Sequence, residues 1–384
     1  MTHPPRLFRR LLPALVLLLL LLSISPGFAA RGAYRAASPE YGVSSFLYNQ
    51  PTTTARDLAM VQGFGFGWVK ALFRWSDIEH DYKGAFNWTE ADRVVQAANA
   101  AGLKVIARLD FQPWWALPGA IRNGPPVNYQ DYADFVYGFV NRYAEDSKIG
   151  RVHAIQVWNE PNLAREWGEQ RITEQSAVDY VRLLDLAYKA AKGADPSVTV
   201  ITAGLSPTGV ADGLAQPDDQ YLGWLYAHGL KGKVNYDVLG ANANVQCPSV
   251  EAAIGACPVA ADKMQHPSFY FRRVEQLRQI QEANGDSDRQ IWLMEFGWTT
   301  DKINPGYSWY ATDEATKAEL IVGAFKYART NWSPWIGVMA LWTLADPTWQ
   351  PQDEQVWWSI TDPDGSPRQA YDRVKQARMA GELP

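Results

Sequence analysis

The sequence lacks the residue patterns by which proteins usually bind nucleic acids, metals and phosphates. Its formal net charge is -5, with no basic run, so it lacks the strongly basic surface of nucleic-acid-binding domains. Its five histidines are scattered without metal-ligand spacing, and the DPDG stretch near the C-terminus is a turn signal without the later glutamate of a calcium loop. No phosphate-cradling glycine loop is present. The sequence therefore predicts no cofactor, no metal and no nucleic-acid partner.

The first thirty residues have the order of a secretory signal peptide. MTHPPRLFRR carries three arginines, LLPALVLLLLLL is apolar, and SISPGFAA ends in small residues. We expect this segment to be removed. The alternative is an uncleaved membrane anchor, because Leu11 to Ala30 just covers the roughly 20 residues that span a bilayer. Under both alternatives the rest of the chain is extracytoplasmic, either secreted or membrane-anchored.

Cysteine is scarce, and its two copies lie close together. Cys247 and Cys257 bracket a short loop in CPSVEAAIGACP. Outside the cytoplasm such a pair favours a disulfide, which the chain-entropy model values at roughly 2 to 3 kcal/mol. A metal site is the weaker interpretation, because the loop has no histidine and two thiolates do not complete a tetrahedral shell.

The remaining residues, 31–384, alternate apolar β-prone runs with helical ones, and no linker interrupts them. The expected helices lie near 52–65, 89–101, 129–146, 174–193, 218–229, 268–284 and 313–331. The expected strands are GVSSFLYN, WVKALFRW, residues 104–110, residues 152–158, VTVITAGLSP, VNYDVLGANANV, RQIWLMEFGWTT and WIGVMALWTLAD. Eight parallel strands with crossover helices over this length predict a single α/β domain, a closed (β/α)8 TIM barrel.

Two carboxylates stand at the ends of expected strands. Glu160 ends the fourth strand in IQVWNEPNLA, and Glu295 ends the seventh in IWLMEFGW. The simpler explanation of the first motif is that strands often stop at Pro and Asn. However, active sites of TIM barrels lie where strands end, and two facing carboxylates can divide glycoside cleavage between a protonated acid and an ionised nucleophile.

These residues also carry a family resemblance, which covers the chain from about residue 42 to 372. WNEPN and the glutamate of LMEFGW resemble the two signatures of the large (β/α)8 clan of retaining glycoside hydrolases that includes families 5 and 39, the cellulase-like and β-xylosidase-like enzymes. FRWSDIEHDYKGAFNWTEADRVVQAANAAGLKVIARLDFQPWWA and WSITDPDGSPRQAYDRV are similar to the clan's second and third strand region and its closing turn and helix. The resemblance implies a glycosidase (EC 3.2.1.-) that hydrolyses O-glycosidic bonds, expected to be β, of oligo- or polysaccharides by double displacement.

The resemblance implies a role for four residues. Glu160 matches the general acid/base and Glu295 the nucleophile. Asn159 matches the asparagine that bonds the sugar 2-hydroxyl, and Trp342 matches an aromatic platform under the sugar, with core packing as its alternative.

The sequence departs from the clan at two strands. Lys70 stands where the clan commonly has arginine; it can keep the nucleophile ionised as a point charge but lacks the planar fork of arginine. GANANV lacks the usual histidine and tyrosine near the sixth strand end, so the tyrosine partner of the nucleophile is not assignable, and Asn242 is a candidate ligand of sugar hydroxyls instead. Trp114 and Trp298 are further candidate sugar contacts, with packing under a loop as the alternative for both.

The expected partner is therefore a carbohydrate substrate, bound by a monomer that touches a membrane only through an uncleaved N-terminal segment. The alternative is a noncatalytic carbohydrate-binding or cell-surface protein on a glycosidase scaffold, favoured by Lys70 and by the missing histidine and tyrosine. The sequence does not specify the sugar, the linkage, or whether cleavage is internal or at chain ends.

Overall fold

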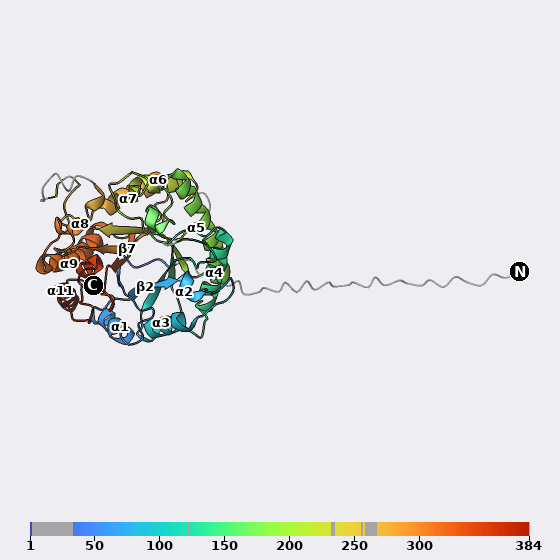
Figure 1. Cartoon of the computed structure of the whole chain (residues 1–384), viewed down its shortest axis with the longest axis horizontal. Helices are drawn as coiled ribbons and strands as arrows, with labels where there is room; N and C mark the ends of the chain where they lie inside the picture. The colour runs from blue at the N-terminus through green and yellow to red at the C-terminus, as the bar shows by residue number, and fades with distance from the viewer. Residues whose placement is uncertain (2–33, 121–122, 232–234, 255, 258–266, 384) are drawn as a thin grey trace. The chain divides into compact units, whose positions relative to one another are not determined.

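A computed structural model describes residues 1, 34–120, 123–231, 235–254, 256–257 and 267–383, and Figure 1 shows strands inside a ring of helices. The strands are β1 (Glu40–Ser44), β2 (Trp68–Arg74), β3 (Lys104–Asp110), β4 (Ala154–Val157), β5 (Thr199–Thr202), β6 (Leu239–Asn244), β7 (Ile291–Gly297) and β8 (Ile336–Leu341). Every paired strand is parallel to its neighbour, as expected for strands joined by crossover helices.

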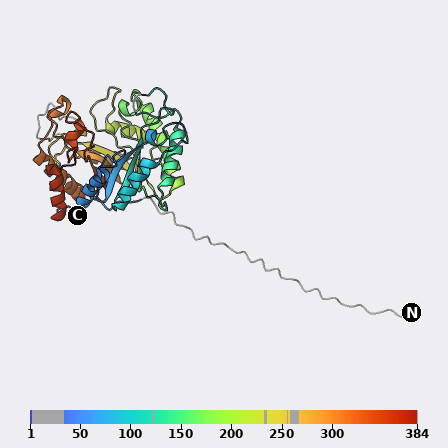
Figure 2. The same ribbon diagram turned by 60° about the horizontal axis from the view of Figure 1, so that its bottom comes forward.

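The helices surround the strands, and their lengthwise packing is visible in Figure 2. They are α1 (Thr54–Gly63), α2 (Trp75–Ile78), α3 (Thr89–Ala100), α4 (Tyr129–Arg142), α5 (Glu174–Ala194), α6 (Asp218–Ala227), α7 (Arg273–Ala283), α8 (Pro305–Ser308), α9 (Glu314–Asn331), α10 (Glu354–Trp358) and α11 (Gln369–Met379), with 3-10 turns η1 (Ala164–Glu166) and η2 (Pro267–Phe269). The short elements α2, α8, α10 and η1 belong to the loops that follow strands, so they lie at the end of the barrel where function is expected.

The sheet is nearly closed. Its order is β5-β4-β3-β2-β1-β8-β7-β6, so the first and last strands in sequence are hydrogen-bonded neighbours. Two isolated parallel bridges, Ile201 to Val238 and Leu205 to Ala241, join β5 to β6 across the remaining seam. The predicted (β/α)8 barrel is therefore confirmed.

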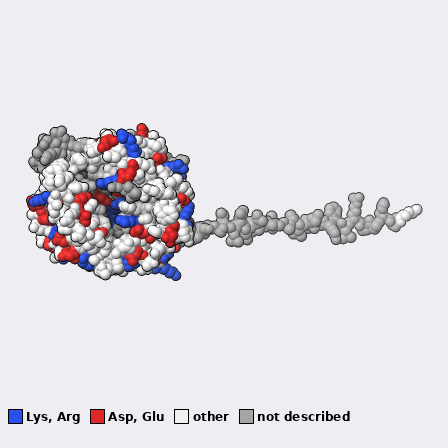
Figure 3. Space-filling view, viewed as in Figure 1, with Lys and Arg blue, Asp and Glu red and all other residues white. Residues whose placement is uncertain are grey.

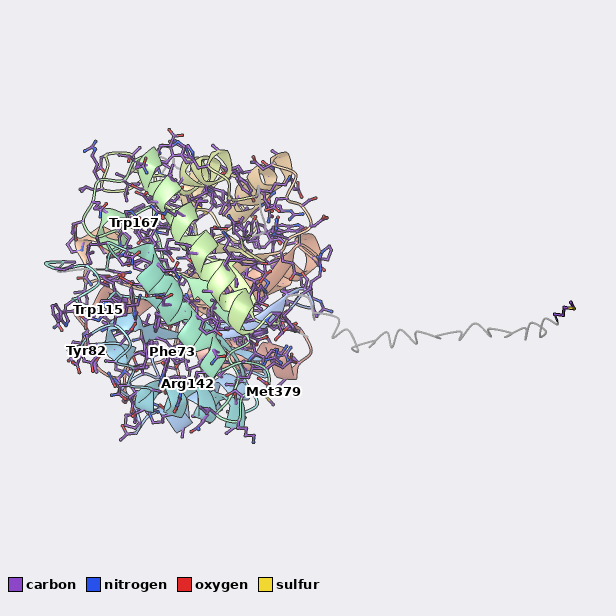
Figure 4. All side chains as sticks on the ribbon, turned by 90° about the vertical axis from the view of Figure 1, so that its right-hand side faces the viewer. Phe73, Tyr82, Trp115, Arg142, Trp167 and Met379 are labelled. Atoms are coloured by element: carbon purple, nitrogen blue, oxygen red, sulfur yellow. A yellow bond between two sulfur atoms is a disulfide. The ribbon has the colours of Figure 1, made fainter. Side chains whose placement is uncertain are left out.

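Strand alternation builds two apolar layers. Trp68, Ile106 and Trp292 belong to a cluster that fills the barrel interior, and Val69 and Val105, one position along, belong to the larger layer between strands and helices. Figure 4 views the side where α4 and α5 lie next to each other. The outer layer is one apolar cluster that includes residues of all eight strands.

The disulfide is present, whereas the N-terminal prediction lies outside the described residues. Cys247 and Cys257 are bonded, with 5.8 Å between their Cα atoms. The signal peptide or anchor of residues 1–30 falls almost wholly within residues 2–33, which the structure does not describe. In the described part of the chain, no helix is both long and apolar enough to cross a membrane.

Candidate active site

A cavity of about 320 Å³ opens at the carboxyl ends of the strands. Figure 3 shows this face, with a hollow that contains both acidic and basic side chains. The walls include four of the residues predicted from the sequence: Asn159, Glu160, Glu295 and Trp342. Three segments that are far apart in the sequence thus meet at one site: the ends of β4 and β8 and strand β7.

The chain turns sharply where it leaves β4, and this turn points Glu160 into the barrel. Trp158 and Glu160 have φ angles of 69° and 42°, in the left-handed region that non-glycine residues seldom adopt. The Glu160 N–H donates to the Gly204 carbonyl at 3.1 Å, and the Asn162 side chain bonds the backbone of the loop after β5. The Asn-Glu-Pro-Asn cluster is therefore a strained turn held by neighbouring loops, which is typical of functional sites.

Glu160 is buried beside another carboxylate. Its Oε1 accepts a hydrogen bond from Asn242 Nδ2 at 3.0 Å, and its Oε2 lies 3.4 Å from Arg165 Nη2. Burial and the negative charge of Glu295 raise the pKa of Glu160, while Arg165, Asn242 and Arg108 oppose the rise. A carboxyl group in these surroundings is suited to hold a proton and release it during a reaction.

Glu295 faces the interior because β7 is irregular. Trp292 and Met294 belong to the inner apolar cluster, so strict alternation would turn Glu295 outward. The register of β7 shifts against both neighbours, between Leu293 and Phe296 on one side and at Asn242, the β6 partner of Glu295, on the other. A bulge of this kind re-aims the side chain, and Glu295 reaches the cavity.

Two cations lie close to the Glu295 carboxylate. Lys70 Nζ donates to Glu295 Oε1 at 2.9 Å and to the Met294 carbonyl at 3.0 Å. Arg108 Nη1 lies 4.0 Å from the same carboxylate oxygen. Burial lowers the pKa of Lys70, and the charge of Glu295 works against that shift. Both cations stabilise the ionised form of the carboxylate.

Asn242 lies next to both carboxylates, beside Glu295 in the sheet and hydrogen-bonded to Glu160, although it does not line the cavity. It is the register partner of Glu295, and neighbouring strands lie about 4.8 Å apart. Its amide donates to Glu160, and its side chain is almost fully buried against Gly204, where an added Cβ would lie only 2.1 Å from Asn242 Oδ1. The glycine therefore makes room for the asparagine, which supports Glu160.

Three further residues predicted for the site lie away from the cavity wall. Lys70 is only 3% exposed and sits beneath Glu295. Trp298 is buried and donates its indole N–H to the Cys247 carbonyl at 2.8 Å, which is the packing alternative. Trp114 is 65% exposed and is not part of the cavity wall. Its neighbour Trp115 lies at the edge of the barrel seen in Figure 4.

Sequence reasoning missed several charged and polar residues that line the cavity beside the two carboxylates. Arg108 lies two positions after the inward Ile106 in KVIARLD, so strand alternation was a signal for it. Arg165 and Glu166 come from η1, and Tyr307 and Glu354 come from α8 and α10. These four residues lie in loops, where no periodicity marks a side chain that faces a cavity.

Comparisons with known proteins agree on the fold. No family model matches the chain. A β-xylosidase of Geobacillus stearothermophilus is 26% identical over 143 residues, which are 34% of this chain and 26% of that enzyme. A family 39 glycoside hydrolase of Bacteroides cellulosilyticus has a TM-score of 0.61 at 17% identity, covering 90% of this chain and 64% of that one. A family 5 (subfamily 18) protein of Streptomyces cattleya, solved with GlcNAc, has a TM-score of 0.62 at 15% identity, covering 91% and 82%.

The fold is thus that of the glycoside hydrolases of families 39 and 5, and the resemblance predicted from the sequence is confirmed at this level. The match to the β-xylosidase spans about a quarter of that enzyme's length.

Proposed function

We propose that the chain is a retaining glycosidase that hydrolyses β-O-glycosidic bonds of oligo- or polysaccharides. The observation that carries this proposal is the pair of carboxylates in one cavity, of which Glu295 has the closer cation. Burial and the charge of Glu295 raise the pKa of Glu160, although Arg165 lies 3.4 Å away. Glu295 Oε1 accepts a hydrogen bond from Lys70 at 2.9 Å and lies 4.0 Å from Arg108. This difference supports Glu160 as the acid and Glu295 as the nucleophile.

In the first step, the Glu295 carboxylate attacks the anomeric carbon while protonated Glu160 gives its proton to the departing oxygen. A covalent glycosyl-enzyme forms and the leaving group departs as an alcohol. In the second step, ionised Glu160 takes a proton from water, which displaces Glu295 from the anomeric carbon. Glu160 is then protonated again and Glu295 is again a carboxylate, so the enzyme is regenerated with net retention.

Asn159 and Trp342 complete the sugar site in this proposal. Asn159 lines the cavity, and its Oδ1 accepts from Gln156 Nε2 at 3.2 Å, which fixes the orientation of its amide. We assign its Nδ2 group to the sugar 2-hydroxyl, a bond that strengthens in the transition state. Trp342 offers an aromatic face in the cavity wall, with Phe46 packed against it at 5.7 Å between ring centroids.

The proposal also covers the domain boundaries, the location and the oligomeric state of the protein. We place the catalytic domain at residues 31–384, acting outside the cytoplasm as a monomer, either secreted or anchored through residues 1–30. The disulfide supports an oxidising compartment. The β-xylosidase relative makes an aryl β-xyloside the first substrate to try, followed by glucosides, mannosides, galactosides and polysaccharides.

The test is hydrolysis by the purified protein, with the first-formed anomer identified by NMR. We expect the β-anomer from a β-glycoside, and loss of activity by several orders of magnitude in Glu160→Gln and Glu295→Gln. Glu174→Gln, which changes a carboxylate in the first turn of α5, is the matched control and should keep wild-type activity. An inverted product would refute the assigned roles. Binding of oligosaccharides without hydrolysis of any substrate would favour the noncatalytic alternative.

A further inference from the structure

A third acidic side chain, Glu166, lines the same cavity and has no part in the two steps above. It lies six residues after Glu160, at the end of η1, and its side chain is only 16% exposed. A carboxylate withdrawn from water in this way requires partners, because burial disfavours its charge.

One oxygen of Glu166 is firmly held. Asn123 Nδ2 donates to Glu166 Oε2 at 2.9 Å, and Asn123 Oδ1 accepts the Phe111 N–H at 2.9 Å. Because the Phe111 N–H requires an acceptor, the amide of Asn123 cannot turn around, and its donor end must face Glu166. Asn123 is itself buried, so the position of Glu166 is fixed from the loop after β3.

Arg165 lies between the two carboxylates. Its Nη2 is 3.4 Å from Glu160 Oε2, and its Nε is 4.0 Å from Glu166 Oε1. Neither contact is a short bidentate pair, and the Arg165 side chain is 58% exposed. It can therefore move toward either carboxylate at small cost.

We propose that Glu166 is a positioning residue that controls, through Arg165, how much positive charge reaches Glu160. This inference rests on the proposed function, because it gives Glu166 a role toward the general acid. When Glu166 is ionised it attracts Arg165 and adds negative charge near Glu160, so Glu160 keeps its proton to higher pH. When Glu166 is neutral, Arg165 turns to Glu160 and favours its ionised form.

The charged groups around Glu160 and Glu166 support this movement of Arg165 between the two carboxylates. Glu166 is faced by Arg108 and Asp110 from β3 and by Glu160 and Arg165 from its own loop, and burial raises its pKa to about 7. Arg165 is also faced by Tyr307 of α8 and Glu354 of α10. The charges that act on Glu160 come from Glu295 on β7, Arg108 on β3 and Arg165. Glu166 therefore changes its charge near neutral pH, in the range where a general acid must remain protonated.

Two substitutions should move the pH profile in opposite directions. Glu166→Gln keeps an acceptor for Asn123 but removes the charge. The basic limb of the pH profile of kcat/KM, where activity falls as Glu160 loses its proton, should therefore shift to lower pH. Arg165→Gln removes the cation from Glu160, so the basic limb should shift to higher pH. We expect about 0.5 to 1 pH unit in each case, below the full effect of a buried ion pair because Arg165 is largely exposed.

The double variant tests whether Glu166 acts through Arg165. If it does, Glu166→Gln should shift the limb less in the Arg165→Gln background than in the wild type. Glu174→Gln is the control for removal of one negative charge outside the cavity and should leave the limb in place. A merely structural role of Glu166 would lower activity at every pH without moving the limb, and that result would overturn the inference.

The same shifts can be measured without turnover, which separates this inference from the proposed function. The carboxyl carbon of Glu160, in protein labelled with 13C at glutamate and assigned by comparison with Glu160→Gln, reports its titration by NMR. If the wild type hydrolyses no glycoside but the two substitutions shift the Glu160 titration as stated, the proposed function fails and the control of Glu160 by Glu166 through Arg165 stands. If hydrolysis occurs but the substitutions shift neither the basic limb of the pH profile nor the NMR titration of Glu160, the control by Glu166 fails and the proposed function stands.

Discussion

Replacing Lys70 with methionine probes the cation beneath Glu295. Lys70→Met keeps an unbranched side chain in a buried position and removes the ammonium that lies 2.9 Å from Glu295 Oε1. The remaining cation, Arg108, lies at 4.0 Å from that oxygen. At an effective dielectric constant of about 20, these distances correspond to attractions of roughly 6 and 4 kcal/mol before desolvation. The substitution therefore removes the larger attraction and leaves the smaller.

Removing one partner of a buried ion pair typically costs about 3 to 5 kcal/mol, because the other charge is left without compensation. Arg108 compensates Glu295 in part, so we expect the free energy of unfolding to fall by about 2 to 3 kcal/mol. Urea unfolding at pH 7, followed by tryptophan fluorescence, measures this change. Lys83→Met is the matched control, since the Lys83 side chain is 46% exposed and its pairs with Asp131 and Asp134 should contribute less than about 1 kcal/mol.

A double-variant cycle isolates the pair. In a Glu295→Gln background, Lys70→Met should cost about 2 kcal/mol less than in the wild type, because no carboxylate is left unpaired. An equal loss in both backgrounds would show that Lys70 stabilises the barrel without acting on Glu295. That result would refute the charge assignment on which the nucleophile depends.

Three further predictions concern other parts of the chain. Burial, together with the charges of Arg151 and Lys104, lowers the pKa of His153 to about 4. An unfolded histidine titrates near 6.5, so the unfolded chain binds more protons than the folded chain between these two pH values. The free energy of unfolding should therefore fall by at most about 3 kcal/mol as the pH drops from 6.5 to 4. Unfolding at stepped pH checks this, and an equal slope in His153→Gln would contradict it. Replacing Cys247 and Cys257 together with serine should lower the free energy of unfolding by roughly 2 to 3 kcal/mol, and an unchanged urea midpoint would show that the loop needs no crosslink. Trp342→Ala should lower kcat/KM at least about tenfold, equivalent to about 1.4 kcal/mol, whereas Trp114→Ala should leave it unchanged; equal effects would argue against the cavity as the sugar site.

The barrel could be predicted because its periodicities are local. Helices present apolar stripes, as Ala91, Val94, Val95 and Ala98 do in α3. Gly102, after α3, has φ 69°, the left-handed conformation that ends helices without steric cost. Repeating this unit with apolar strands leaves few topologies other than a parallel barrel.

The site could be predicted only in part, because its details depend on register and loops. Alternation from Trp292 and Met294 would place Glu295 on the outer face, and only the bulge of β7 turns it inward. The loop residues Arg165 and Glu166 meet Glu160 through a short 3-10 turn, which has no sequence period.

Tryptophan shows a related limit of sequence reasoning. Trp298 and Trp342 each follow a strand, yet one packs in the core and the other lines the cavity. The type of residue does not decide between these outcomes; the neighbouring loops do.

The central claim is that Glu295 forms a covalent bond to the sugar, and trapping that bond tests it most directly. Glu160→Ala, given an aryl glycoside whose leaving group needs no protonation, should accumulate the glycosyl-enzyme because no base activates the water of the second step. Peptide mass spectrometry should then find one sugar unit on the peptide that contains Glu295, and none on it in Glu160→Ala/Glu295→Gln. A sugar attached to another residue, or turnover by Glu160→Ala with inversion and no adduct, would contradict the account.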